Sequence, residues 1–201
     1  MTQVALVDYG VGNIFSMKKA LEKAGLEVRV TSDRDEIVDA PGIVLPGVGN
    51  FGAVAGKIQP LKESMIESIE GGAPLLGSCL GMQLLFEWSE EATGGGLSLL
   101  KGGVVRFPES VKTPHMGWNT LDATKPNELL ESIEERSYFY FVHSYYVDPI
   151  DPTIIAAETQ HGIDFTSVVA HGSLYGTQFH PEKSGKAGAA LLENFAKTIR
   201  R

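Results

Sequence analysis

The chain has 201 residues, of which 43% are hydrophobic and 21% charged, the balance of a globular protein with one well-buried core. We therefore expect a single domain over residues 1–201. A formal net charge of −8 without a cluster of lysine or arginine argues against nucleic acid as a partner. The single cysteine excludes an internal disulfide, and no apolar run approaches the ~20 residues that cross a membrane. We expect a cytoplasmic protein that does not bind membranes.

The first half of the chain alternates short apolar runs with amphipathic stretches. The predicted strands are residues 4–7, 28–31, 43–45 and 75–78. Helices are predicted near residues 14–24, from the third strand up to about residue 69, and after Cys79. Strands that alternate with helices in this way predict a parallel sheet with crossover helices.

A glycine-rich turn at residues 47–52 reads Gly-Val-Gly-Asn-Phe-Gly and follows a predicted strand. It formally matches the G-x-G-x-x-G pattern of dinucleotide-binding proteins. However, it lies on a later strand than that pattern normally occupies, Pro46 stiffens the turn, and no clear strand-terminal acid follows about 20 residues on. A second interpretation is a loop whose glycines let backbone amides approach Cys79. A plain tight turn fits both interpretations.

The only cysteine stands between two glycines, in the sequence Gly-Ser-Cys-Leu-Gly of residues 77–81. A nucleophile on a sharp strand-to-helix turn requires small flanking residues of this kind. Apolar residues then recur at helical spacing, at Leu80, Leu84, Leu85 and Trp88. The helix N-terminus would lie beside the sulfur, where its dipole favours a thiolate and its free N–H groups can bind an oxyanion.

The second half of the chain is richer in strands and ends in a helix. The predicted strands are residues 103–107, 138–143, 154–158, 165–170 and 174–179, and the helix covers 188–200. Residues 94–96 and 108–114 are predicted as loops. Together with the first half, this pattern predicts an α/β fold whose mixed, mostly parallel sheet carries helices on both faces.

A base for the thiol is best sought at His180, in the extended sequence His-Pro-Glu. Residues two apart in an extended chain project to the same side, so His180 and Glu182 can share a face, and Pro181 keeps His180 out of helical conformation. Cys79, His180 and Glu182 then form a nucleophile, a base and an orienting carboxylate. His115 and His143 have no comparable case.

Each of these residues also has an ordinary structural interpretation. A lone cysteine is usually a small buried hydrophobe, His180 alone would be a structural histidine at a strand end, and Glu182 alone a solvated charge. The glycine flanks and the His-Pro-Glu element, taken together, favour catalysis.

The sequence Gly-Ser-Cys-Leu-Gly-Met-Gln around Cys79, followed by His180-Pro181-Glu182, resembles the class I (triad) glutamine amidotransferases over essentially the whole chain. Further blocks resemble the glutaminase subunits of imidazole glycerol phosphate synthases; they are residues 8–13, 46–49, 114–119 and 140–146. The resemblance implies the single-domain amidotransferase fold, no cofactor and no metal. It also implies hydrolysis of glutamine to glutamate and ammonia through a thioester on Cys79.

The resemblance also assigns roles to residues around the triad. The backbone N–H of Leu80 and one from the Gly47–Val48 peptide would form the oxyanion hole. Substrate would be held by Gly49, Gln83, Glu91, Ser144 and Tyr145. A carboxylate such as Glu91 suits the ammonium of glutamine, and backbone amides suit its carboxylate. The ordinary alternatives are a solvent-facing Gln83 and a loop charge at Glu91.

The ammonia must be used close to where it is released, and the chain has no stretch left for a second enzyme. The resemblance implies a separate (β/α)8-barrel cyclase as the partner subunit in histidine biosynthesis. Asn13, Trp118 and Lys183 are candidates for the facing surface, with burial of Trp118 in the core as the alternative. Because Gly47 and Gly49 flank Val48, we expect a loop that is misaligned, and little glutaminase activity, until the partner binds.

Three other functions fit parts of the sequence. A glutaminase that serves another acceptor shares the triad and differs in the blocks named above. A cysteine hydrolase on a related α/β fold shares the cysteine turn but does not require the His-Pro-Glu element. A regulatory protein that retains the fold predicts no effect of replacing Cys79.

Overall fold

The computed structural model describes residues 2–123 and 125–200. Its first half contains, in order, β1 (Thr2–Val7), α1 (Ile14–Lys23), β2 (Leu26–Thr31), α2 (Arg34–Val38), β3 (Ile43–Leu45), α3 (Phe51–Ile58), η1 (Gln59–Leu61), α4 (Lys62–Glu70), β4 (Leu75–Ser78) and α5 (Leu80–Gln83). The predicted strands and the predicted alternation are confirmed here. The long helix predicted up to residue 69 is divided at Pro60, which has no N–H to donate within a helix.

The second half begins with the short strands β5 (Trp88–Ser89), β6 (Ala92–Gly95), β7 (Gly102–Arg106), β8 (His115–Asn119) and β9 (Asp122–Ala123). It continues with η2 (Glu128–Leu130), β10 (Phe139–His143), β11 (Tyr145–Pro149), η3 (Pro152–Ile154), β12 (Ile155–His161), β13 (Ile163–His171), β14 (Leu174–Thr177), η4 (Pro181–Lys183) and α6 (Gly185–Ile199). The last helix begins three residues earlier than predicted.

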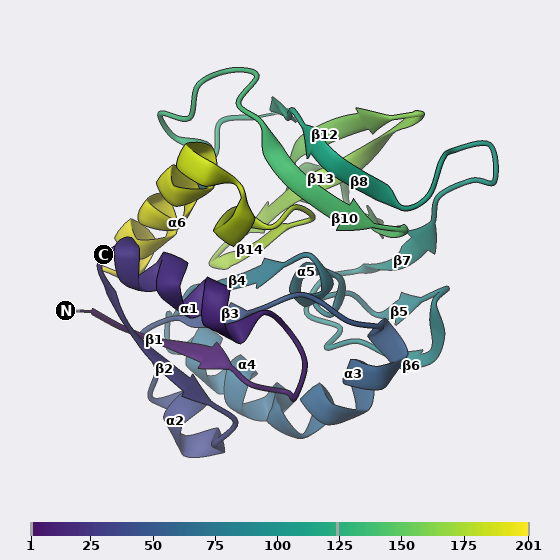
Figure 1. Ribbon diagram of the computed structural model, residues 1–201. Helices are drawn as coiled ribbons and strands as arrows, with labels where there is room; N and C mark the ends of the chain where they lie inside the picture. Colours follow the sequence, from purple (N-terminus) through teal and green to yellow (C-terminus); the bar gives the residue numbers. More distant parts are fainter. Residues whose placement is uncertain (1, 124, 201) are drawn as a thin grey trace.

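The main sheet joins these strands in the order β2-β1-β3-β4-β14-β13-β11-β7-β5-β6, and β12 pairs with β13 on one side and with β9 on the other. Strands β2, β1, β3, β4 and β14 run parallel. Beyond β14 the neighbouring strands are antiparallel, except that β7 and β5 are parallel. A separate small sheet pairs β8 with β10 (Figure 1). The predicted α/β fold with a mixed sheet is confirmed.

Side chains alternate across the parallel strands and build a core on each face of the sheet. Val4 and Leu6 of β1 pack with residues of α1 and α6, whereas Ala5 and Val7 pack with residues of α2, α3 and α4. Figure 1 shows the two helix groups on opposite sides of the sheet. A period of two places successive side chains on opposite faces, so residues 4–7 of β1 and the whole of β3 are apolar, as strands buried on both faces must be.

Two local predictions are wrong. The helix after Cys79 ends at Gln83, and Trp88 begins β5 instead of extending the helical face. The carbonyls of Leu84 and Leu85 accept the amides of Leu97 and Leu99, at 2.7 and 2.8 Å, so the returning chain takes the bonds that a longer helix would use.

The predicted loop at residues 94–96 was the other error, because Gly94 and Gly95 lie in β6, where Gly95 is paired with Trp88. The strand β8, which directly follows the predicted loop at 108–114, was not predicted from the sequence at all. Its partner β10 lies far along the chain, so no local pattern indicates the pairing.

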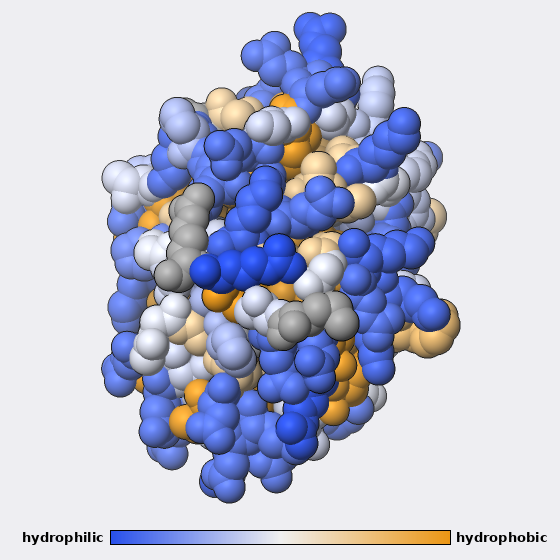
Figure 2. Space-filling view, turned by 90° about the vertical axis from the view of Figure 1, so that its left-hand side faces the viewer, coloured by the Kyte–Doolittle hydropathy of each residue, from blue (hydrophilic) through white to orange (hydrophobic). Residues whose placement is uncertain are grey.

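Among the described residues, none of the helices is both long and apolar enough to span a bilayer. Figure 2 shows the side of the molecule on which both chain ends lie, and hydrophilic residues dominate it. Among the large exposed hydrophobic side chains, Met116, Trp118 and Tyr138 belong to the β8–β10 sheet or directly precede it.

Candidate active site

Cys79 occupies a strained turn between β4 and α5. Its backbone has φ 49° and ψ −107°, a conformation that residues with a side chain rarely adopt. The flanking glycines are required by space: a Cβ on Gly77 would come within 2.5 Å of the Gly81 carbonyl oxygen, and one on Gly81 within 2.1 Å of the Leu45 oxygen. The sequence motif therefore reflects backbone contacts that admit no side chain.

His180 lies beside this turn because β14 and β4 are adjacent parallel strands. Ser78 is paired with Thr177, and the Cys79 amide donates to the Thr177 carbonyl at 2.6 Å. The chain after β14 passes Cys79 and is held by the His180 amide, which donates to the Tyr140 carbonyl at 2.9 Å. Residues about a hundred positions apart thus meet at the carboxyl end of the parallel strands.

The imidazole of His180 is paired with Glu182. His180 Nδ1 lies 3.0 Å from Glu182 Oε1, and the two side chains are only 1% and 3% exposed. His180 Nε2 and Glu182 Oε2 are buried and have no hydrogen-bond partner among the described residues. The ring is therefore fixed through Nδ1, while Nε2 is available for proton transfer.

The surroundings of His180 favour its charged form. Burial alone would lower the pKa of His180, but interactions with Cys79 and Glu182 outweigh it and raise the pKa to about 9. A carboxylate and a sulfur that can carry negative charge stabilise an imidazolium between them. The arrangement is that of an activated thiol with its base and an orienting carboxylate.

The glycine-rich loop after β3 packs directly on the cysteine turn. A Cβ on Gly47 would lie 1.7 Å from the Ser78 oxygen and 2.6 Å from the Leu80 nitrogen, so the loop backbone adjoins the first amide of α5. That amide has no carbonyl partner within its own helix. The predicted oxyanion groups at Gly47, Val48 and Leu80 are therefore brought together, and Gly49 has φ 139°.

Tyr9, two residues after the end of the neighbouring strand β1, holds the base of this loop. Its hydroxyl donates to the Pro46 carbonyl, and a Cβ on Gly12 would come within 3.3 Å of the Pro46 ring. Tyr9 is 4% exposed. Burial raises its pKa far above the ordinary value, with further contributions from negative charge at Cys79 and Asp8, so this hydroxyl remains a neutral donor at physiological pH.

One cavity of about 350 Å³ lies over the cysteine turn. Its lining contains Cys79, His180 and all eight residues predicted for the oxyanion hole and the substrate, which are Gly47, Val48, Gly49, Leu80, Gln83, Glu91, Ser144 and Tyr145. Sequence reasoning missed Pro114 and Val142 as lining residues and made no case for His143. The Cys79 thiol donates weakly to the Val142 carbonyl, at 4.0 Å.

Gln83 and Glu91 both have defined positions in this cavity. Gln83 is 5% exposed, and its amide donates to the Tyr145 carbonyl at 3.1 Å, so the solvent-facing alternative is wrong. One oxygen of Glu91 accepts the Phe51 amide at 2.7 Å, at the start of α3. Glu91 is thus not a free loop charge: its carboxylate is fixed beside the glycine-rich loop.

A buried pair of histidines supports the side of the cavity that is formed by the end of β10 and the start of β11. His143 Nδ1 donates to the Tyr145 carbonyl at 2.8 Å, and His115 Nδ1 lies 3.1 Å from His143 Nε2. Burial, and secondarily His161, lowers the pKa of His115 to about 4, and burial lowers that of His143 to about 3. Both rings are therefore neutral at pH 7 and position the backbone of β10 and β11.

The three residues predicted for a partner surface belong to elements that contact one another. Trp118 is 55% exposed, so the core alternative is wrong. Its ring meets that of Tyr140 edge to face at 5.8 Å, and the Lys183 ammonium lies 5.8 Å from the centre of the same ring. Asn13 caps α1 by accepting the Ser16 amide at 3.2 Å, and α1 packs against η4, which carries Lys183.

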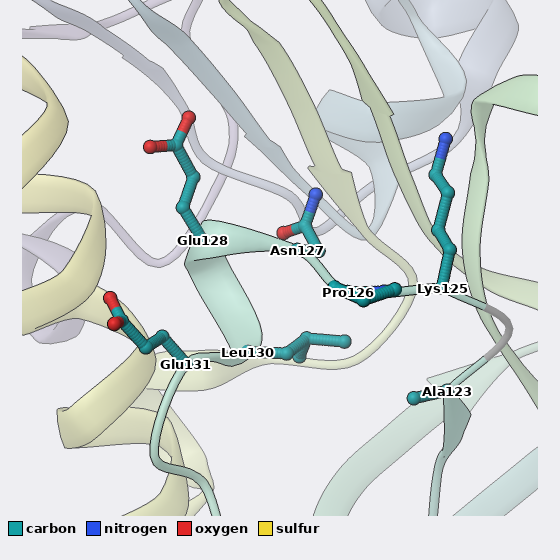
Figure 3. A pocket seen from close by; sticks show the side chains of 7 residues that line it. All are labelled: Ala123, Lys125, Pro126, Asn127, Glu128, Leu130 and Glu131. Carbon is teal, nitrogen blue, oxygen red and sulfur yellow. The ribbon is translucent and has the colours of Figure 1, made fainter.

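A larger and more open hollow, of about 720 Å³, lies away from the cysteine. Figure 3 shows its lining, which is Ala123, Lys125, Pro126, Asn127, Glu128, Leu130 and Glu131. These residues include no thiol and no imidazole. Volume alone therefore does not locate the active site; the strained cysteine and the buried ion pair do.

Comparisons with known proteins agree with this geometry. The family model "Glutamine amidotransferase class-I" matches residues 5–199. The imidazole glycerol phosphate synthase subunit HisH of Pyrococcus furiosus is 51% identical and covers 98% of this chain and 100% of its own length. The HisH subunit of Moorella thermoacetica is 45% identical, covering 100% and 97%, and that of Archaeoglobus fulgidus 48% identical, covering 98% and 100%.

Solved structures show the same fold at lower identity. A crystal structure of a glutamine amidotransferase superposes with a TM-score of 0.77 at 17% identity, covering 98% of this chain and 99% of the other. A chain of PurLQS from Thermotoga maritima gives 0.77 at 20% identity, covering 98% of each. With a family match over nearly every residue and relatives 45% to 51% identical along their full lengths, the chain belongs to the class I glutamine amidotransferases and, among them, to the HisH subunits of imidazole glycerol phosphate synthase.

Proposed function

We propose that this chain, as one glutaminase domain, hydrolyses glutamine at Cys79 and passes the ammonia to a separate (β/α)8-barrel cyclase. The observation that carries the proposal is the cavity of about 350 Å³, because its lining combines a strained cysteine, a buried histidine and polar groups suited to an amino acid. The names of the relatives support an imidazole glycerol phosphate synthase as the complete enzyme.

The reaction follows from the triad in two steps. The Cys79 thiolate attacks the side-chain amide carbon of glutamine, and the C–N bond breaks as protonated His180 supplies a proton to the departing ammonia. His180 then removes a proton from water, whose oxygen attacks the thioester and releases glutamate with the sulfur as leaving group. Glu182 holds the imidazole through Nδ1 in both steps. No metal or cofactor is needed.

The negative oxygen formed in each step requires nearby N–H donors. The Leu80 amide and one amide of the Gly47–Val48 peptide are the proposed donors, since Gly47 packs against the Leu80 nitrogen. Glu91 would receive the substrate ammonium, and the backbone at Ser144 and Tyr145, together with Gln83 and Gly49, would hold its remaining polar groups.

The partner would dock on the outward face of the β8–β10 sheet and the adjoining start of α1. Met116 and Trp118 of β8 and Tyr138, just before β10, are exposed. Tyr140 is partly exposed between the buried Phe139 and Phe141 of β10, and Asn13 and Lys183 would flank these side chains. Exposed aromatic residues beside a cation are typical anchors of protein interfaces. Val142 belongs to the same face of β10 and also lines the cavity, so a partner seated here would adjoin the site of ammonia release.

The decisive experiment measures glutamate release by the chain alone and with a candidate barrel cyclase and its nucleotide ligand. We expect little turnover alone and a large increase with the liganded cyclase, all of it lost in Cys79→Ala. Full turnover without the cyclase would contradict the proposed coupling. Turnover that depends on Cys79 but does not respond to the cyclase would support the glutaminase activity and show that the ammonia acceptor is a different enzyme. The absence of Cys79-dependent hydrolysis in both conditions would overturn the proposal.

A further inference from the structure

Gln178 is a buried polar residue with no role in the mechanism above, and the sheet places it beside the nucleophile. Ser78 of β4 is paired with Thr177 of β14, so the next residues of these parallel strands, Cys79 and Gln178, lie next to each other. The Gln178 side chain is 0% exposed, and its amide nitrogen lies 3.6 Å from the Cys79 sulfur.

The orientation of the Gln178 amide follows from its neighbours. The Tyr145 carbonyl can only accept, so Gln83 must present its NH₂ group there, at 3.1 Å. The same NH₂ group of Gln83 lies 3.3 Å from Gln178 Oε1, which must therefore be the acceptor. The NH₂ group of Gln178 therefore faces the Cys79 sulfur. A flipped amide would place an oxygen against the sulfur and two NH₂ groups against each other.

We propose that Gln178 is a further catalytic residue, whose N–H donates to the Cys79 sulfur and stabilises the thiolate, and that Gln83 and the Tyr145 carbonyl fix its orientation. The inference rests on the proposed function in that Cys79 is the nucleophile. Hydrogen bonds to an ionised group are about twice as strong as those between neutral groups, so this donor favours the thiolate over the thiol.

Gln178 differs from the ionisable groups around the sulfur. His180 and Tyr9 interact electrostatically with Cys79, and Glu91 and His143 line the same cavity. The amide of Gln178 does not titrate, so its donation persists when His180 loses its proton. It also connects the nucleophile to the proposed substrate segment, because the chain of amides from Gln178 through Gln83 ends at Tyr145.

The test uses Gln178→Leu, which removes the amide at similar volume, and Gln178→Glu, which replaces the donor with a charged acceptor. The matched control is Gln160→Leu, because Gln160 is exposed at the end of β12. Since Cys79 is the only cysteine, alkylation by iodoacetamide reports on this sulfur alone. The alkylation rate at pH 7, divided by the plateau rate at high pH, gives the fraction of Cys79 that is thiolate at pH 7. Because both rates come from the same variant, differences between variants in how easily the reagent reaches the sulfur cancel.

We expect Gln178→Leu to lower the thiolate-to-thiol ratio calculated from this fraction by about 10-fold, the scale of one hydrogen bond to a charged group, and Gln178→Glu to lower it further. In the complex with the cyclase, kcat should fall in the same order while KM changes little, and Gln160→Leu should behave as wild type. Thermal unfolding checks that each variant is folded. Should one variant fail to fold, the other supplies the test.

An unchanged alkylation ratio in a folded Gln178 variant would overturn the proposal, even if kcat fell, because a purely structural role could lower kcat. The alkylation measurement needs neither glutamine nor the cyclase. If the wild-type chain failed to hydrolyse glutamine, the proposed function would be wrong. The alkylation ratio would still show whether Gln178 donates to the sulfur.

Discussion

The turn at Cys79 and the β8–β10 sheet both contribute to one cavity, yet they are built in opposite ways. At the cysteine turn, the backbones at the ends of β3 and β4 and at the start of α5 touch directly, and Gly47, Gly77 and Gly81 leave no space for a Cβ. In the β8–β10 sheet, aromatic rings pack on both faces: His115 stacks on Phe141 at 4.8 Å on the buried face, and Trp118 is half exposed on the other.

Because of this difference, the two regions should tolerate different kinds of substitution. Contacts between backbones cannot adjust, so the cysteine turn should lose its chemistry with the addition of a single methyl group. A side chain that protrudes into solvent can be truncated without altering the fold, so changes on the outward face of β8–β10 should affect association alone. Four predictions test this contrast, from the largest effect to the smallest.

The largest effect should come from removing the nucleophile. Cys79→Ala should lower stimulated glutamate release by at least about 10⁴-fold, because the members of a triad act as a unit. Cys79→Gly should lose the same activity while raising the melting temperature, since glycine adopts φ 49° without strain. Glutamate release and thermal unfolding measure the two effects. Retention of a tenth of the wild-type activity in either variant would exclude Cys79 as the nucleophile.

The second prediction concerns the loop that covers the turn. Gly47→Ala should reduce stimulated turnover by about 100-fold, the cost of losing one oxyanion donor, because its Cβ would collide with the Ser78 carbonyl. Gly56→Ala in α3 is the matched control, since a Cβ there meets nothing within 4 Å, and alanine favours a helix by up to about 1 kcal/mol. Equal activities of the two variants would show that the loop can move away without loss.

The third prediction concerns the outward face of the β8–β10 sheet. Trp118→Ala should weaken binding of the cyclase by about 2 kcal/mol, the scale of an interface anchor, and leave the melting temperature of the isolated chain unchanged. Calorimetric titration measures the first quantity. Ile150→Ala is the control, because Ile150 is 73% exposed but lies outside this surface. A drop in melting temperature without a change in affinity would assign Trp118 to the fold.

The smallest effect, taken per pH unit, should appear in the pH dependence of stability, and it should have opposite signs in the two regions. The pKa of His180 is raised from 6.5 to about 9 in the folded protein, so the stability it adds is full below pH 6.5 and is lost as pH rises toward 9. The pKa values of His115 and His143 are lowered to about 4 and about 3, so their contribution is full above pH 6.5 and is lost as pH falls.

Each histidine should change the free energy of unfolding by at most about 1.4 kcal/mol per pH unit within its own window. Denaturant unfolding between pH 4 and pH 9 measures these slopes. His180→Gln should flatten only the alkaline slope, and His143→Gln only part of the acidic one. If His180→Gln left the slope between pH 6.5 and 9 unaltered, the imidazolium would not be stabilised by Cys79 and Glu182.

The two regions also differ in how far sequence reasoning could reach. Gly77, Cys79 and Gly81 are close in sequence, and a nucleophile on a tight turn requires this local pattern, so the strained turn was predictable. Strand β8 was missed because its stability comes from pairing with β10, some twenty residues away, and not from local propensity. The length of α5 was misjudged for the same reason, since a distant segment takes the carbonyls of Leu84 and Leu85.

The class of fold, the triad candidates and the glycine positions could be predicted from the sequence, because alternating polarity and short motifs act over a few residues. Which side chains share a cavity depends on the packing of the whole chain. It paired Ser78 with Thr177 and so brought Cys79, Gln178 and His180 together, and it turned Trp118 outward and His143 inward. Strand register and sheet order are set by contacts between distant parts of the chain, which no local pattern records.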